Sequence, residues 1–404
     1  MGRHQYRRAK AALVCISTLA ILAGSATTAS AALPSTTPDE TLGVNGKVRA
    51  IVQVGNVLWV AGKFTALVER AGNVVQSGLN GLAAIDATTG LKATGVSIPA
   101  LSGSSAMVWD LSVDGSDVYA AGTFEAANGS KNLLEFDGAT GSLGDRFSAS
   151  ALKSVLVDGS LVLGGGGKMN AWTRTGAKVS SFATTTVRTD PSLRAHSTSP
   201  MYTDIAPMPG GGWLTACKCD WALNPGESTG SATLEKAIVR LLPDGRIDHT
   251  WNKQISPTSA AFGWSLEIDS DGVVLAAGGS DFTQKLTFDG QQIWKTDTNG
   301  SSQVVIRFDD RYIVGGHFRC VGNDVFHPRL VALTLSGARD PGWVIPITPQ
   351  YNGVWALHQS GGSLWVGGEF TKVGGAWNPP NQSCSGTKPT AAGQSTQYRL
   401  ARFS

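Results

Sequence analysis

Short apolar stretches separated by glycine-rich turns recur along most of the chain. The clearest copies contain an apolar or aromatic pair, small residues, a glycine, a variable residue and a phenylalanine. They lie at Leu58–Phe64, Val118–Phe124, Tyr312–Phe318 and Leu364–Phe370, with weaker copies at Leu161–Gly165, Leu275–Gly278 and Trp213–Cys217. Equivalent positions are about 50 residues apart, so the sequence contains one repeat written seven times.

Each copy has similar neighbours. A short apolar stretch precedes it, as in Val48–Ile51, Val108–Leu111 and Val354–Leu357, and an Asp-Gly or Gly-Gly turn lies between the two stretches. Apolar runs that flank such turns indicate β-hairpins. A third stretch follows, and a fourth segment ends at an aromatic residue, namely Phe147, Phe182, Trp251, Trp294 or Trp343. Four short antiparallel strands repeated seven times predict an all-β fold, a β-propeller of seven four-stranded blades.

The burial of apolar surface explains why such sheets would form a ring. A sheet with two apolar faces covers both only when a neighbour stacks on each side. The repeated glycine would let a backbone or an aromatic ring approach closely, and the phenylalanine would wedge between blades. The last repeat has no fourth segment, so we expect Pro38–Asn45 to pair there and close the ring. No linker divides residues 36–404, which predicts a single domain.

The first 31 residues have the three parts of a secretory signal peptide. Arg3, Arg7, Arg8 and Lys10 precede an apolar run over 11–24, and Ala29-Ser30-Ala31 is a small-residue cleavage pattern. The apolar run is shorter than the ~20 residues that span a bilayer. We therefore expect a cleaved leader and a secreted, extracellular or cell-wall-associated product, with a retained anchor as the alternative.

Composition limits the possible partners. The 404-residue chain has 50 glycines and only 16% charged residues, while 42% are hydrophobic, which excludes a disordered tail. Cleavage after residue 31 removes four of the 33 Lys and Arg residues and none of the 30 Asp and Glu residues, so the mature charge is −1. A nearly neutral chain lacks the basic surface that binds nucleic acid, and it contains no basic run that would bind anionic membranes. We expect a monomer that does not insert into a membrane after cleavage.

The repeat motif resembles a known family. Its pattern V-x-A-I, turn, L-W-V-x-G-x-F-T and L-A-A-I-D-x-x-T-G is similar to the delta-60-type β-propeller repeats of exported actinobacterial proteins. The stretches 38–48, 353–357, 364–375 and 399–403 carry the likeness most clearly, and Cys217-Lys218-Cys219 departs from it. The resemblance implies a seven-bladed or similar propeller outside the cell, and it implies no reaction or catalytic residues.

Four cysteines follow the leader, and an oxidising compartment permits them to form disulfides. Three connectivities are possible. We favour Cys320 with Cys384, because both follow equivalent strands in consecutive repeats. Cys217 and Cys219 would face the same way in a strand. A zinc site is disfavoured, because this C-x-C lacks a second close pair of ligands.

The sequence contains no recognisable catalytic motif, cofactor motif or metal motif. Asp269-Ser270-Asp271-Gly272 resembles part of a calcium loop, but a hairpin turn explains it better, and calcium remains an alternative. Trp109, Trp264 and Trp355 lie in first strands, nearest the axis of a propeller, and His358 follows such a strand. These four residues are our candidates for contact with a ligand.

Three functions are compatible with these predictions. The favoured one is a non-enzymatic module that binds a protein or a carbohydrate at the cell surface. The second is a secreted hydrolase, lyase or quinone-dependent dehydrogenase with its site in the propeller tunnel, an analogy from fold alone. It predicts Asp, Glu or His side chains at one tunnel mouth, whereas an apolar tunnel would count against it. The third is a passive structural spacer.

Overall fold

The fold of this protein is built from β-strands. A computed structural model describes residues 33–190, 199–230, 234–255, 261–322, 325–348, 353–378, 384 and 390–404. Over these residues there are strands, turns and bends and no helix, which confirms the all-β prediction. The strands belong to one compact unit, Leu33–Ser404. The predicted leader lies outside the described residues.

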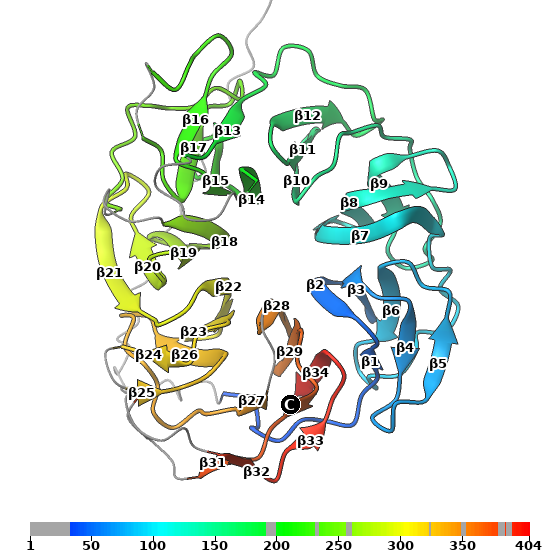
Figure 1. The fold of residues 1–404 in the computed structure, drawn as a ribbon. Helices are drawn as coiled ribbons and strands as arrows, with labels where there is room; N and C mark the ends of the chain where they lie inside the picture. The colour runs from blue at the N-terminus through cyan, green and yellow to red at the C-terminus, as the bar shows by residue number, and fades with distance from the viewer. Residues whose placement is uncertain are drawn as a thin grey trace, which may run out of the picture. The chain divides into compact units, whose positions relative to one another are not determined.

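The described residues form twelve antiparallel sheets, and the seven main ones follow one another along the chain (Figure 1). In chain order, sheets 1 to 7 contain β2 (Lys47–Val54), β3 (Val57–Lys63) and β6 (Leu82–Asp86); β7 (Leu101–Asp114), β8 (Asp117–Ala126) and β9 (Lys131–Asp137); β10 (Ser154–Asp158), β11 (Leu161–Gly165) and β12 (Met169–Thr173); β14 (Met201–Pro207), β15 (Trp213–Lys218) and β17 (Ile238–Leu241); β18 (Phe262–Asp269), β19 (Gly272–Gly278), β20 (Phe282–Leu286) and β21 (Gln292–Asp297); β22 (Ser302–Phe308), β23 (Arg311–Gly316) and β26 (Leu330–Thr334); and β28 (Val354–Ser360), β29 (Ser363–Gly368) and β34 (Leu400–Phe403). The first strand of each sheet is called its inner strand.

The prediction of four strands in every sheet is wrong. In the described part of the chain, only sheet 5 has a fourth paired strand, β21. Elsewhere the fourth segment forms an isolated bridge with the third strand instead of a regular ladder, as between Leu241 and Ile247. Trp251 and Trp343 also donate their indole N–H to backbone carbonyls beside the neighbouring sheet, at 3.0 Å to Phe288 and 2.8 Å to Pro34. Isolated bridges and a buried ring with one hydrogen bond therefore hold these segments at the outer edge of their sheets.

The inner strands form a continuous series. Each packs beside the inner strand of the next sheet, from β2 through β7, β10, β14, β18 and β22 to β28, and β28 packs beside β2. Figure 1 shows these strands facing a common axis, with the second and third strands farther out. Antiparallel sheets arranged around an axis in this way form a β-propeller.

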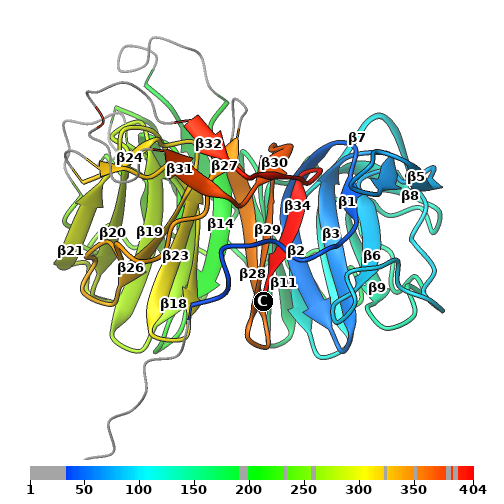
Figure 2. The same ribbon diagram turned by 90° about the horizontal axis from the view of Figure 1, so that it is seen from below.

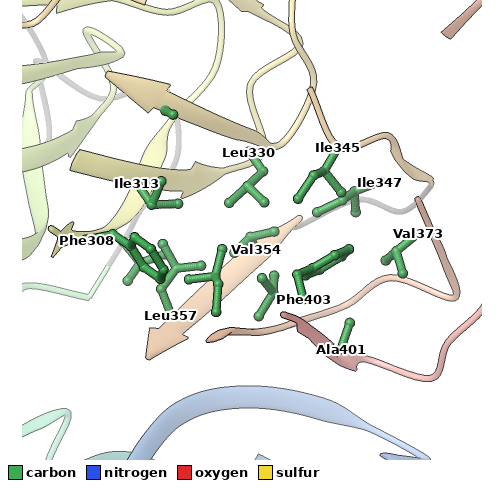
Figure 3. Close-up of a cluster of buried hydrophobic side chains, with 14 of the residues drawn as sticks. Phe308, Ile313, Leu330, Ile345, Ile347, Val354, Leu357, Val373, Ala401 and Phe403 are labelled. Carbon is green, nitrogen blue, oxygen red and sulfur yellow. The ribbon is translucent and has the colours of Figure 1, made fainter. Parts of the chain in front are cut away.

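Successive sheets bury their apolar faces against each other. Between sheets 6 and 7, Phe308 and Ile313 face Val354, Leu357 and Phe403 across a shared core (Figure 3). All five side chains are buried. At ~25 cal/mol per Å² of apolar surface, such interfaces are the main source of stability. No sheet could supply this burial alone.

The repeated glycines and phenylalanines have the packing roles expected of them. A Cβ on Gly62 would lie 1.9 Å from the carbonyl oxygen of Lys47, and a Cβ on Gly368 would lie 2.2 Å from that of Gly353. The inner strand therefore approaches the second strand too closely for any other residue. The motif phenylalanines that follow, such as Phe318 and Phe370, are fully buried.

The N-terminal segment runs along the outer strand of sheet 7. The backbone N–H of Ser35 donates to Ser404 and that of Asp39 donates to Arg402, both at 2.8 Å. The N–H of Val44 donates to Tyr398 at 2.9 Å. These bonds connect the two ends of unit Leu33–Ser404 in antiparallel order, although residues 35–39 do not form a regular strand.

Smaller sheets extend one end of the propeller (Figure 2). They contain β1 (Gly43–Val44), β4 (Ala66–Val68) and β5 (Val74–Ser77); β13 (Thr186–Arg188) and β16 (Trp221–Leu223); β24 (Cys320–Val321) and β25 (Val325–Phe326); β27 (Ile347–Thr348), β30 (Lys372–Val373) and β33 (Ser395–Thr396); and β31 (Ala376–Asn378) and β32 (Thr390–Ala392). Most of them follow a second strand. Because first and second strands are antiparallel, these insertions lie at the end where the inner strands begin. We call it the insertion end.

We predict that Gly62→Ala destabilises the protein more than Gly55→Ala does. The Gly62 variant forces a methyl group against a backbone carbonyl, and overpacking of this kind costs about 1–3 kcal/mol. Gly55 has a φ of 56°, and no atom lies within 4 Å of the place that its methyl group would take. The Gly55 variant therefore loses only the energy of holding alanine in a left-handed backbone conformation, about 1–2 kcal/mol. Thermal unfolding of both variants measures the difference. Equal losses would contradict the close approach.

Candidate functional site

A shared β-bulge aims one residue of most inner strands toward the axis. The pairing register skips one residue in β2, β7, β14, β18, β22 and β28. The skipped residues are Arg49, Trp109, Thr203, Trp264, Gln303 and Trp355. Bulges redirect side chains and are frequent beside functional sites. The pairing of β10 is regular, and Lys153 directly precedes that strand.

These bulged residues and Lys153 line an axial cavity of about 240 Å³. The cavity is bounded by residues from six of the seven main sheets and by Lys153, which directly precedes β10 of sheet 3. Except in the longer β7, the bulges occur near the start of the inner strands, so these side chains lie toward the insertion end. We call the cavity-lining residues Arg49, Trp109, Lys153, Trp264 and Trp355 the axial belt. It brings together side chains from sheets 1, 2, 3, 5 and 7.

Both cations of the axial belt lie against aromatic rings. The Lys153 ammonium lies 3.5 Å from the ring centroid of Trp109, and the Arg49 guanidinium carbon lies 4.9 Å from the same ring. That carbon is also 3.7 Å from the centroid of Trp355, which meets Trp264 edge to face at 5.1 Å. Cation–π contacts are worth about 0.5–2 kcal/mol and strengthen as water is excluded. The stacking therefore fixes both cations at the cavity wall.

The polar groups of the axial belt that have no hydrogen-bond partner are all donors. Within the described part of the chain, Arg49 Nε, Trp264 Nε1 and Trp355 Nε1 are buried and have no partner. The Lys153 ammonium forms no hydrogen bond or ion pair with the described residues, although the backbone N–H of Lys153 donates to Gly165 at 2.7 Å. Buried polar atoms without partners cost about 1–3 kcal/mol each, so such a cluster calls for an explanation. A ligand that presents acceptor oxygens would satisfy all four groups.

Three carboxyl groups line the same cavity and connect neighbouring inner strands. Asp110 accepts the backbone N–H of Val155 at 2.8 Å, and Asp204 accepts that of Leu266 at 2.7 Å. Glu267 accepts the N–H of Arg307 in the same way. Each bond joins one sheet to the next, from β7 to β10, from β14 to β18 and from β18 to β22. The primary role of these acids is therefore to hold adjacent sheets together.

Burial shifts the ionisation of the cavity groups. It lowers the pKa of Arg49 to about 10, against the opposing charge of Glu369. Burial, together with the charge of Arg49, lowers the pKa of Lys153 to about 8. Burial raises the pKa of Glu267 to about 7. The pKa values of Asp110 and Asp204 are also raised by burial, and that of Asp110 further by the charge of Asp204.

The structure places the predicted ligand residues as follows. Trp109, Trp264 and Trp355 all line the axial cavity. His358 follows the lining residue Leu357 but is not itself part of the lining, and burial lowers its pKa. Contact of any of the four with a ligand stays a prediction. Sequence reasoning missed Arg49 and Lys153, although Arg49 occupies the repeat position of Trp109 and Trp355.

The predicted turn and the cysteines have structural partners within the chain. Asp269 pairs with Gly272 across a hairpin turn, and its carboxylate contacts Lys285, Arg307 and Tyr312 instead of facing open space. Cys320 and Cys384 lie at disulfide-bonding distance, with Cα atoms 6.1 Å apart. Cys217 and Cys219 form the other such pair, with Cα atoms 5.3 Å apart.

A second cavity, of about 500 Å³, lies beside sheet 4. Its buried Glu235 contacts Lys253 and, at 3.2 Å, His249 Nδ1. His249 Nε2 is 3.0 Å from Glu227. These charged groups are partners of one another, so this cavity offers a ligand fewer unsatisfied groups than the axial belt does.

Two further kinds of feature are absent from the residues that the structure describes. No helix among them has the length and apolar character needed to cross a bilayer. They also contain no group of three or more His, Cys, Asp or Glu side chains that could hold a metal ion.

Comparison with known proteins gives only distant likenesses. No protein-family model and no curated protein matches the sequence. The chain is similar to the computationally designed Ika8 protein, with 11% identity, a TM-score of 0.44 and coverage of 90% of this chain and 98% of that one. The WD40 β-propeller domain of Doa1 has 10% identity and a TM-score of 0.48, with coverage of 82% of this chain and 93% of that one. BamB from Moraxella catarrhalis has 12% identity and a TM-score of 0.41, with coverage of 81% of this chain and 97% of that one. These three TM-scores are below 0.5, so the likenesses support no functional statement.

We predict that Asp110→Ala and Asp204→Ala each lower the free energy of unfolding by about 1–3 kcal/mol, because each leaves a backbone N–H without its acceptor. The exposed Asp145→Ala is the control and changes stability little. The folded-state pKa of Asp110 lies above the unfolded-state value, so its contribution falls as pH rises between the two. The gap between wild type and Asp110→Ala should therefore narrow with rising pH in denaturant unfolding. Losses matching the control would contradict this role.

Proposed function

We propose that this chain is an exported β-propeller that binds the end of a glycan at the cell surface through its axial cavity. The observation that carries the proposal is the axial belt, where unsatisfied N–H donors lie among half-buried tryptophan rings. Sugars offer acceptor oxygens to such donors and apolar C–H faces to aromatic rings. Pockets combine apolar walls with a few placed polar groups in the same way.

The size of the cavity limits what can enter it. At about 240 Å³ it is smaller than the ~300–1,000 Å³ of pockets that enclose drug-sized ligands. It suits one ring or one side chain. A terminal sugar residue is therefore the favoured occupant, and a protein side chain is the alternative that the binding experiment below distinguishes.

The proposed architecture is a ring of seven blades closed by the N-terminal segment. Trp294 donates its indole N–H to Leu335, which follows the third strand of sheet 6, and Trp343 donates to Pro34. Pro34 thus occupies the place of a residue following β34. The bond from Ser35 to Ser404 supports the same arrangement. A closed ring hides edges that would otherwise pair with other chains.

Export is proposed from the leader pattern and the cysteines. Residues 1–31 combine a basic head, an apolar run and a small-residue exit. Two cysteine pairs at disulfide-bonding distance are compatible with an oxidising compartment. A cell-surface location gives the axial cavity access to polysaccharide.

A hydrolase with its site in the tunnel is the second candidate. Asp110, Asp204 and Glu267 provide the acidic groups that it requires, with raised pKa values suited to a general acid. We rank it second because each of these carboxyl groups already accepts a backbone N–H. Release of reducing sugar from a bound glycan, abolished by Glu267→Gln, would favour this candidate over a binding module.

Removal of residues 33–41 tests the closure. The truncated chain loses backbone bonds to sheet 7, the ion pair between Asp39 and Arg402 and the acceptor for Trp343. We expect a lower thermal midpoint and association between copies through the bared β34, measured by calorimetry and light scattering. Trp343→Phe is the matched control, because it removes one hydrogen bond and leaves the edge covered. A monomer as stable as wild type would overturn the closure.

Trp264→Phe and Trp355→Phe test the binding site. Each keeps an aromatic ring but loses an N–H donor, and we expect binding to weaken about 5- to 10-fold, as loss of one hydrogen bond implies. Trp251→Phe makes the same change outside the cavity and should leave affinity unchanged. Glycan-array binding followed by calorimetry measures the effect. Binding to no glycan, or to peptides alone, would overturn the proposal.

A further inference from the structure

The two cations of the axial belt have too little opposing charge. Arg49 lies 3.5 Å from Glu369, but the same carboxylate oxygen is 2.9 Å from Lys47. Lys153 has no carboxylate within ion-pair distance among the described residues. Both side chains contact the ring of Trp109 in sheet 2. Arg49 comes from the preceding sheet, sheet 1, and Lys153 comes from the start of the following one, sheet 3. A cation that is desolvated without a counter-ion is costly.

The acids of the cavity do not provide that counter-charge. Asp110, Asp204 and Glu267 use their oxygens on backbone N–H groups of neighbouring strands. Arg49 and Lys153 form no ion pair with any of the three in the described part of the chain. Burial also favours the neutral form of each of these acids. The belt therefore keeps positive charge that a ligand could neutralise.

We propose that the group held by Arg49 and Lys153 is a carboxylate, so that the axial cavity selects acidic, uronic-acid-type saccharides over neutral ones. The proposal rests on the glycan-binding function given above and names its ligand class.

Geometry and charge both support a carboxylate. The Arg49 guanidinium carbon lies 3.7 Å from the ring centroid of Trp355, and Nε has no partner among the described residues. Planar carboxylates match the N–H fork of a guanidinium, while the Lys153 ammonium acts as a point charge with three donors. Glu369 offsets part of the charge of Arg49 but is shared with Lys47. Arg49 and Lys153 together therefore retain net positive charge that a carboxylate would neutralise.

The pH dependence of binding follows from Lys153 and from the other titratable groups that line the same cavity. These are Arg49 from β2, Asp110 from β7, Asp204 from β14 and Glu267 from β18. As pH rises, the three acids ionise and repel a carboxylate, and Lys153 loses its proton near its pKa of about 8. Both changes weaken the binding of an acidic sugar. Only the second depends on Lys153.

The experiment measures binding of three probes to the mature chain by calorimetry at pH 6. The probes are methyl glucuronide, its neutral methyl ester and methyl glucoside, with the galacturonide series run in parallel. We expect the acids to bind about 10- to 100-fold more tightly than the esters, as a charge-assisted hydrogen bond implies. Added salt should reduce this preference.

Variants identify the source of the preference. Lys153→Met keeps an unbranched chain over Trp109 without charge, and we expect it to lose most of the acid preference and the fall in affinity near pH 8. Arg49→Lys keeps the charge but not the fork and should lose part of the preference. Lys131→Met, at an exposed position paired with Glu125, is the control and should behave as wild type.

Each result decides between the proposals. Acid preference that disappears in Lys153→Met supports the carboxylate. Equal binding of acid, ester and glucoside overturns the carboxylate but keeps a glycan site. Binding of no sugar probe, or binding of acidic peptide only, overturns both. Tighter binding of glucose 6-phosphate than of either uronide would replace the carboxylate by a phosphate.

Discussion

Burial of the apolar faces of each sheet against its two neighbours is the constraint on which this structure depends. A three-stranded sheet with apolar side chains on both faces cannot be stable alone. Stacking covers both faces only if the series of sheets returns to its start, as the packing of β28 beside β2 allows. The close approaches at Gly62 and Gly368 follow from the same demand, because any side chain there would separate paired strands.

The bulges let the inner strands pack against their neighbours while one residue of each bulged strand faces the axial cavity. Residues on either side of a bulge, such as Val48 and Ala50 in β2, continue the regular ladder and are buried. The skipped residue makes no ladder pair and faces the axis. A single extra residue per inner strand thus places Arg49, Trp109 and Trp355 in a common belt without disturbing the sheets that carry them. The carboxyl groups of Asp110 and Asp204 brace the same strands from one position further along.

Much of the fold could be predicted from the repeat, whereas the site could be predicted only in part. The hairpins at Asp114-Gly115 and Asp269–Gly272 follow from turn chemistry that acts over a few residues. The fourth strands could not be predicted correctly, because a segment held by an isolated bridge and a buried aromatic ring has the same sequence pattern as a fully paired strand. Trp109, Trp264 and Trp355 were recognisable by their place in first strands. The pairing of Arg49 and Lys153 with these rings arises between sheets, which no local pattern encodes.

The near-equivalence of the bulged positions has an evolutionary consequence. Arginine, tryptophan, threonine and glutamine occupy the same place in different sheets, so the scaffold tolerates chemically unrelated residues there. Exchange of one such residue would alter what the axis recognises while leaving the sheet interfaces intact. Neighbouring members touch, so their substitutions would not be energetically independent. Different combinations of residues at the bulged positions would therefore give different binding specificities on the same scaffold. Duplicated units could acquire a new specificity by substitution at one such position at a time.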